Sequence, residues 1–172
     1  MEQEIDTLIQ PHHQEIELLD TIPGISQDAA ASILAEIGPD MSKFPIDAHL
    51  ASWVGVCPAN NESAGKKKSK KNRRGNKGLK SVLCQAGWAA IKSKNTRISS
   101  VYNRLLKRCG PQKANTAIAH LMIRIIYVML RDKVPYQELG ERYLGSKEKT
   151  VDYWVRKIRE MGYQVELTET TI

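Results

Sequence analysis

The chain has 172 residues, of which 41% are hydrophobic and 26% charged, so its composition supports a buried core and excludes a disordered chain. No run of 18 apolar residues occurs, because Arg124 interrupts the longest apolar stretch, and we therefore expect no membrane-spanning helix and no membrane partner. The acidic start of the chain lacks the apolar segment of a secretory signal. Three widely spaced cysteines do not suggest a disulfide framework. Together these features predict a cytoplasmic protein.

The net charge of +7 is unevenly distributed along the chain. Residues 1–65 carry eleven acidic side chains and one base, Lys43, whereas residues 66–131 carry eighteen Lys or Arg and neither Asp nor Glu. A surface with both positive and negative side chains would keep the protein equally soluble without this self-repulsion. The natural partner is a polyanion, and nucleic acid is favoured over a solvated basic face or an acidic protein partner. Because the basic segment contains no carboxylates, we predict no metal site there.

The first predicted elements are two short helices joined by a turn. Apolar residues recur at helical spacing from Ile5 to Leu19, and Pro11 breaks or kinks this segment. A second helix is expected to begin after Ser26 as its N-cap and to end at Gly38. Because Pro23 and Gly24 lie between these helices, the pattern predicts a helix-hairpin-helix element.

The rest of the chain continues as helices separated by turn signals, so the fold is predicted to be all-α. Residues 66–78 are rich in charge and glycine and are predicted to form a flexible basic loop. We interpret Trp53 and Trp88 as core anchors rather than base-stacking platforms. The further helices are expected at 46–54, 79–90, 98–109, 113–130, 135–144 and 149–161.

Two segments are candidates for contact with nucleic acid. The hairpin residues Gly24, Ile25 and Ser26 place backbone N–H groups at a helix N-terminus, which favours a phosphate. The alternative for this hairpin is an interhelical turn without a ligand. The second segment is the basic run that begins at Lys66. Its proposed DNA-binding residues are Lys66, Lys67, Lys68, Lys70, Lys71, Arg73, Arg74, Lys77 and Lys80.

A polar loop directly precedes the basic run and contains the candidate nucleophile, Ser63. A serine hydroxyl attacks a phosphodiester only when a base removes its proton or when cations stabilise the developing charge. Lysines and arginines a few residues further along could supply those cations. The alternative is that Ser63 is a polar loop residue beside a solvated basic face.

Several blocks of the sequence resemble a known family in the same order. They include Leu19–Ile25, Leu50–Gly55, Asn60–Lys66 and Gln85–Ala90, and the match continues to Leu139-Gly140. Over about residues 19–145 the chain resembles the C-terminal domain of the insertion-sequence-110 (116/110/902) family of transposases. We accordingly expect three parts: the end of a linker or coiled-coil helix (1–18), the transposase helical domain (19–145), and a C-terminal helix with a tail (146–172).

The resemblance implies a function for the polar loop and the basic run. Family members are similar to site-specific recombinases in which a serine, here Ser63, attacks a DNA phosphate to form a phosphoserine link. They also have an N-terminal RuvC-like domain with four acidic metal ligands, which this chain lacks, so a divalent metal is expected in that domain and no cofactor in this chain. The resemblance further implies an element-encoded guide RNA and a homo-oligomer in the active complex. Without the metal domain, the isolated chain is expected to be inactive.

Two other functions remain open at this point. The chain could be a nucleic-acid-binding module without chemistry, such as a transposase remnant. It could also be a homo-oligomer in which the acidic residues 1–40 bind the basic stretch.

Overall fold

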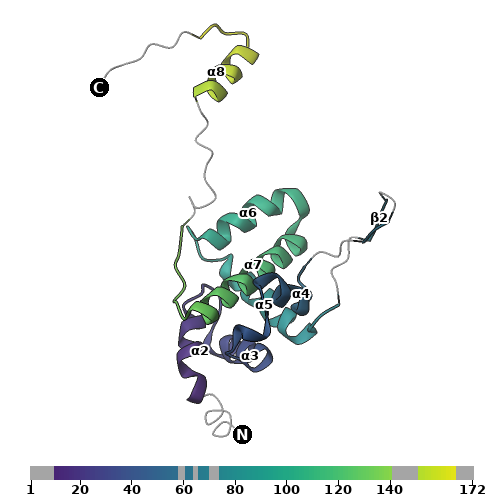
Figure 1. Cartoon of the computed structure of the whole chain (residues 1–172). Coiled ribbons are helices and arrows are strands. Elements are labelled where there is room, and N and C mark those ends of the chain that lie inside the picture. Colours follow the sequence, from purple (N-terminus) through teal and green to yellow (C-terminus); the bar gives the residue numbers. More distant parts are fainter. Residues whose placement is uncertain (1–9, 58–60, 64–65, 70–73, 141–150, 166–172) are drawn as a thin grey trace, which may run out of the picture.

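The computed structural model describes residues 10–57, 61–63, 66–69, 74–140 and 151–165, and for residues 61–63 and 66–69 it describes the backbone. The described residues form seven α-helices, two 3-10 turns and one two-stranded ribbon, which confirms the all-α prediction (Figure 1). The elements are η1 (Gln10–His12), α2 (His13–Asp20), α3 (Gln27–Ile37), η2 (Met41–Lys43), α4 (Asp47–Val54), β1 (Asn61–Ser63), β2 (Lys66–Ser69), α5 (Lys77–Ala90), α6 (Arg97–Cys109), α7 (Pro111–Asp132) and α8 (Val151–Glu160).

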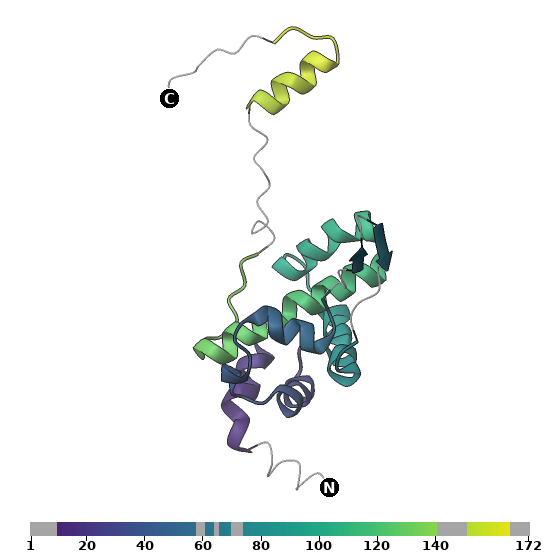
Figure 2. The same ribbon diagram turned by 45° about the vertical axis from the view of Figure 1, so that its right-hand side comes forward.

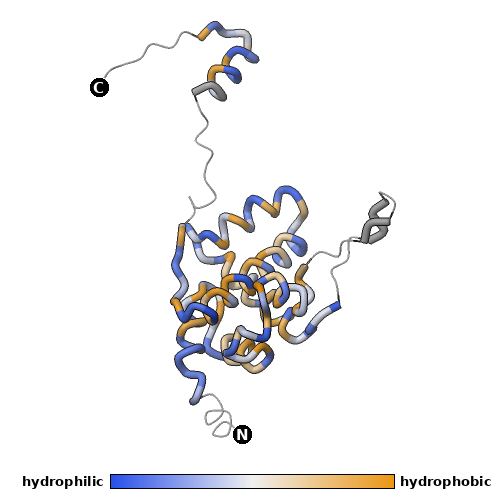
Figure 3. The backbone as a smooth tube through the Cα atoms, viewed as in Figure 1, coloured by the Kyte–Doolittle hydropathy of each residue, from blue (hydrophilic) through white to orange (hydrophobic). Residues whose placement is uncertain are grey.

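Helix α7 is the centre of the helical body, and α2, α4, α5 and α6 pack around it. Its fully buried side chains recur every three or four residues, from Ile118 through Met122 and Ile126 to Leu130. Figure 3 shows hydrophobic residues gathered in this body. Among the described helices α7 is also the one with the length and apolar composition to cross a membrane, and 56% of that apolar window is buried in the protein. Core helices of globular domains share these properties.

Side-chain caps define where three of the helices begin. Ser26, Asn76 and Thr96 each accept a hydrogen bond from the backbone N–H three residues further along. The sequence prediction of Ser26 as an N-cap is therefore confirmed. The predicted helices at 46–54, 79–90, 98–109, 113–130 and 149–161 correspond to α4, α5, α6, α7 and α8.

The turn between α2 and α3 faces the interior of the body. Gly24 has a φ of +87°, and a Cβ at this position would lie 2.4 Å from the backbone nitrogen of Ala90 and 2.5 Å from the carbonyl oxygen of Ala86. Ile22 and Ile25 on either side are buried. The turn thus seats the helix pair directly on the backbone of α5.

The predicted helix at 135–144 is wrong over residues 135–140, which form no helix. The backbone N–H of Tyr136 donates instead to Thr21 Oγ1 (3.1 Å), and the Glu138 carboxylate accepts from the backbone N–H of Arg97 (2.8 Å). Pro135 has the character of a helix start, but these bonds to distant elements hold the segment extended across the body. Residues 141–144 lie outside the described residues.

The predicted loop at 66–78 is also partly wrong. Lys66–Ser69 form β2, which pairs with β1 in an antiparallel ribbon, and α5 already begins at Lys77. The ribbon projects from the body in Figure 1, where it lies on the side of α4 and α5. Helix α8 also stands away from the body, as the turned view in Figure 2 shows.

Candidate nucleic-acid interface

The β1–β2 ribbon brings Ser63 next to the start of the basic run. In its register the Cα atom of Ser63 lies opposite that of Lys66, and Glu62 lies opposite Lys67. An irregularity between Asn61 and Glu62 shifts the pairing, so that Asn61 lies opposite Ser69. Sequence spacing alone could not establish this pairing, because a loop of the same length has many conformations.

The segment that leads from the ribbon into α5 is seated tightly on the end of α4. A Cβ on Gly75 would lie 2.4 Å from the backbone nitrogen of Gly55 and 2.5 Å from the carbonyl oxygen of Val54. The next backbone N–H, that of Asn76, donates to the carbonyl oxygen of Trp53 (3.3 Å). The two ends of the chain that carry the ribbon therefore meet in direct backbone contact.

Side chains reinforce this junction from two further directions. Asn76 Oδ1 accepts from the backbone N–H of Leu79 (3.0 Å), while its Nδ2 donates to Glu36 Oε2 of α3 (2.6 Å). Lys80 Nζ donates to the carbonyl oxygen of Gly55 (3.3 Å). Gly75 and Asn76, the residues directly before α5, are thus anchored to α3, α4 and α5 together.

The remaining sequence-predicted cations are distributed around this base. Lys66, Lys67 and Lys68 lie on β2, whereas Lys70, Lys71 and Arg73 lie outside the described residues. Arg74 and Lys77 are exposed where the chain enters α5. The structure therefore brings Lys66–Lys68 alongside the strand of Ser63 and extends the charge along the start of α5.

The helix hairpin does not lie at the same place. Gly24 contacts Ala86 and Ala90 near the C-terminal end of α5, whereas Asn76 caps its N-terminus. The fourteen residues between Asn76 and Ala90 correspond to a helical rise of about 20 Å. The turn at Gly24 and the junction at Asn76 accordingly lie at opposite ends of α5.

The surroundings of the hairpin favour the interpretation as an interhelical turn. Ile25 is buried, and its backbone N–H donates to the carbonyl oxygen of Ile22 (3.1 Å). Ser26 is exposed, but its hydroxyl accepts the capping hydrogen bond from Ala29. Contact of Gly24, Ile25 and Ser26 with DNA stays a prediction.

The interpretation of Trp53 and Trp88 as core anchors is wrong. Trp53 is 43% exposed and Trp88 is 41% exposed. In α4 the buried positions belong to Leu50, Ala51 and Val54, and in α5 they belong to Leu79, Leu83, Ala86, Gly87 and Ala90. Each tryptophan lies outside the buried face of its helix. The spacing of the apolar residues in the sequence already indicated this.

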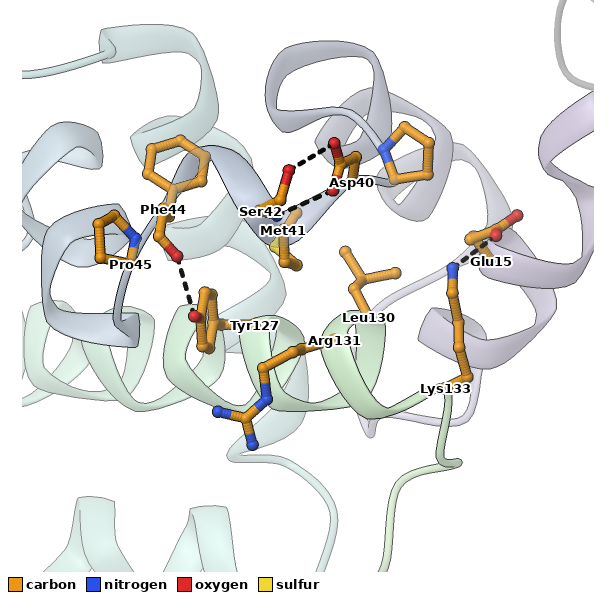
Figure 4. A pocket seen from close by; sticks show the side chains of 11 residues that line it. Glu15, Asp40, Met41, Ser42, Phe44, Pro45, Tyr127, Leu130, Arg131 and Lys133 are labelled. Atoms are coloured by element: carbon orange, nitrogen blue, oxygen red, sulfur yellow. Dashed lines mark hydrogen bonds and ion pairs between the residues drawn. The ribbon is translucent and has the colours of Figure 1, made fainter.

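An open pocket of about 670 Å³ lies at the C-terminal end of α7, apart from the ribbon (Figure 4). Its charged side chains are engaged with neighbours: Lys133 with Glu15 (2.8 Å) and Arg131 with Asp132 (2.7 Å). The hydrogen bond from Lys133 holds the pKa of Glu15 below its ordinary value. The Lys133–Glu15 pair joins the end of α7 to α2, whereas the Arg131–Asp132 pair lies within α7, so these charges have structural partners.

A metal site is not evident in the described part of the chain. There, no three His, Cys, Asp or Glu side chains are grouped closely enough to hold an ion.

Comparison with known proteins assigns the chain to a family. Residues 16–103, just over half of the chain, match the model of the transposase IS116/IS110/IS902 family. The chain belongs to this family. The matched region begins within α2 and contains α3 to α5, both strands of the ribbon and the first half of α6.

Two curated relatives of the transposase family agree with this assignment. The insertion element IS110 uncharacterized 43.6 kDa protein of Streptomyces coelicolor is 28% identical over 139 residues, which cover 80% of this chain and 34% of the relative. The transposase for insertion sequence element IS1111A of Coxiella burnetii is 26% identical over 129 residues, which cover 73% of this chain and 35% of the relative. The chain spans about a third of the length of these relatives.

Proposed function

We propose that this chain is the DNA-binding, serine-bearing part of a transposase and that Ser63 is its nucleophile. In the proposed step the hydroxyl oxygen of Ser63 forms a bond to a DNA phosphorus atom and gives up its proton to a base. The bond from phosphorus to the leaving deoxyribose oxygen breaks, and that oxygen takes up a proton. The product is a phosphoserine link between protein and DNA.

The observation that carries this proposal is the pairing of Ser63 with Lys66 across the ribbon. A phosphodiester under attack acquires extra negative charge on its equatorial oxygens, and fixed cations stabilise that charge more than they stabilise the ground state. Lys66–Lys68 lie on the strand opposite Ser63, and Gly75, which follows the basic run, is held against the end of α4. Membership of a transposase family makes DNA the expected substrate.

The divalent metal expected from the family resemblance is outside this proposal for the chain's own residues. The resemblance implies that an acidic N-terminal domain holds it, and no step above depends on it. An element-encoded guide RNA would bind the same cations through its phosphates. Exchange of two DNA strands would need at least two copies of the chain.

The test is trapping of the covalent intermediate by the complete transposase. Wild-type protein should leave a DNA-linked band on a denaturing gel, and Ser63→Ala should abolish that band while retaining DNA affinity. Ser69→Ala is the matched control, because Ser69 lies on the neighbouring strand of the same ribbon. A DNA adduct of undiminished yield in Ser63→Ala would overturn the assignment of the nucleophile.

The second candidate is a nucleic-acid-binding module that catalyses no reaction. The observation that favours it is the acid-free segment 66–131, which needs no nucleophile to bind a polyanion. It predicts strong DNA binding by both wild type and Ser63→Ala and an adduct from neither.

Salt dependence separates both candidates from a protein-only partner. Six to ten phosphate contacts would lower DNA affinity by about 10³–10⁵ between 50 and 200 mM salt. DNA binding that is weak at low salt and insensitive to it would instead favour the homo-oligomer of acidic and basic segments.

A further inference from the structure

The solvent face of α5 carries a line of polar and cationic side chains around one tryptophan. The first four positions are separated by four, four and three residues within α5, so they lie on one side of the helix axis. The fifth follows in the turn directly after α5. The α5 stripe, as we call it, consists of Lys77, Ser81, Gln85, Trp88 and Lys92, all of them exposed.

Trp88 is held in place from behind although its ring is 41% exposed. The ring of Tyr102 in α6, which is buried, meets it nearly edge-on with centroids 6.0 Å apart. The preceding residue, Gly87, approaches α7 so closely that a Cβ there would lie 2.6 Å from Asn115 Oδ1. The backbone beneath Trp88 is therefore fixed, and the protein presents a large aromatic surface at little cost in side-chain entropy.

The electrostatic setting of Trp88 selects a polyanion. Both helices that hold it, α5 and α6, lie within the acid-free segment, and α6 exposes Arg104, Lys107 and Arg108. An apolar protein partner would gain nothing from these charges, whereas a nucleic acid would use both the cations and the ring. Base faces are available for stacking only where bases are unpaired, since a duplex already stacks them.

The α5 stripe also continues the candidate interface. Lys77 follows directly on Asn76, whose N–H is bound to the end of α4 beneath the ribbon. From Lys77 to Trp88 the helix rises about 16 Å. A strand that follows α5 from Lys77 would pass the polar side chains of Ser81 and Gln85 before it reaches Trp88.

We propose that Trp88 is a stacking platform for an unpaired nucleobase, with Lys77 and Lys92 as phosphate contacts on either side of it. The α5 stripe thereby binds a single-stranded segment of nucleic acid. This inference rests on the proposed function, because it extends the interface on which Ser63 acts, and it adds a second contact with its own chemistry.

The test measures binding of the full chain to three labelled probes: a single-stranded oligonucleotide, the same oligonucleotide with abasic nucleotides, and a duplex. Trp88→Ala should weaken single-strand binding about tenfold or more, in keeping with the loss of one stacked base. Binding of the abasic strand and of the duplex should change less than about twofold, because neither offers a free base face. Trp88→Phe should restore most of the lost affinity. Measuring a deoxythymidine and a uridine oligonucleotide side by side shows whether the stripe prefers DNA or RNA.

Trp154→Ala is the matched control, since Trp154 is an exposed tryptophan on α8, outside the α5 stripe. Its single-strand affinity should equal that of wild type. Lys77→Ala should reduce the slope of log affinity against log salt by about 0.7 for a single strand, which Trp88→Ala should leave unchanged.

Three results would overturn the inference. Unchanged single-strand affinity in Trp88→Ala would exclude stacking, and equal losses on all three probes would indicate a merely structural role. A change of oligomeric mass with single-strand affinity intact would show that a second copy covers this face. In each case salt-dependent binding by wild type would leave the proposed function standing, whereas failure of wild type to bind any probe would remove both.

Discussion

Gly75 and Gly78 lie three residues apart at the base of the ribbon and have opposite surroundings. A Cβ on Gly75 would meet backbone atoms of Val54 and Gly55 within 2.5 Å, and backbone cannot move aside cheaply. We expect Gly75→Ala to lower the free energy of unfolding by about 1–3 kcal/mol and to weaken DNA binding by displacing the ribbon. Chemical denaturation and DNA titration measure the two effects.

The matched substitution is Gly78→Ala, at the second residue of α5. Its Cβ would meet only the side-chain atoms Asn76 Oδ1 at 3.4 Å and Glu36 Oε1 at 3.7 Å. Because alanine favours helix, we expect stability to rise by up to about 1 kcal/mol. Equal effects of the two substitutions would contradict the seating of Gly75 on α4.

For single residues, the sequence predicts the structural role of some and not of others. Ser26 was identifiable as an N-cap because capping depends on neighbours three residues away. The contact of Gly75 with Gly55 joins positions 20 residues apart, and no local pattern indicates it. Trp88 was assigned to the core on residue type, although its place outside the apolar stripe of α5 was visible in the spacing.

At the scale of elements, Asn76 couples α5 to α3 with one side chain. Its Oδ1 caps α5 and its Nδ2 binds Glu36. We expect Asn76→Ala to lower the free energy of unfolding by about 0.5–2 kcal/mol, the usual cost of a lost N-cap. Asn76→Ser retains a capping oxygen and should recover most of that loss, as measured by denaturant titration. If Asn76→Ser is no more stable than Asn76→Ala, the capping hydrogen bond does not stabilise the fold as described.

The sequence mispredicts β2 and residues 135–140 for two different reasons. β2 consists of three lysines and a serine, so it has no alternating apolar pattern that would predict a strand. Residues 135–140 carry a helix-like start but are held extended by hydrogen bonds to Thr21 and to the backbone of Arg97. Helices with a buried apolar stripe, such as α7, were predictable because their own periodicity determines them.

For the molecule as a whole, the separation of charge gives the body and the interface different roles. Acidic residues of the N-terminal third lie on the helices that close the body around α7, where Glu15 pairs with Lys133 and Asp47 with Arg124. The acid-free segment provides β2, α5, α6 and nearly all of α7. Salt in solution should therefore weaken nucleic-acid binding far more than it weakens the fold, since the core is held by apolar burial.

The ion pairs Glu15–Lys133 and Asp47–Arg124 also predict how the stability of the fold depends on pH. A hydrogen bond from Lys133 lowers the pKa of Glu15, and one from Arg124 lowers the pKa of Asp47. A carboxyl whose pKa is lower in the folded than in the unfolded chain stabilises the fold fully above its unfolded pKa, about 4 for these residues. That stabilisation is lost as the pH falls through the lower, folded pKa, so the melting temperature should drop below about pH 5.

Glu15→Gln tests the Glu15–Lys133 pair alone, because it removes the carboxylate of that pair. Because glutamine does not titrate, its melting temperature should lie below that of wild type at neutral pH and should fall less steeply on acidification. Asp20→Asn serves as the control, since Asp20 is an exposed carboxylate on the same helix, α2. Thermal melts of the three proteins from pH 7 to pH 3 make the comparison. Parallel curves for wild type and Glu15→Gln would mean that the Glu15–Lys133 pair does not hold α2 against the end of α7.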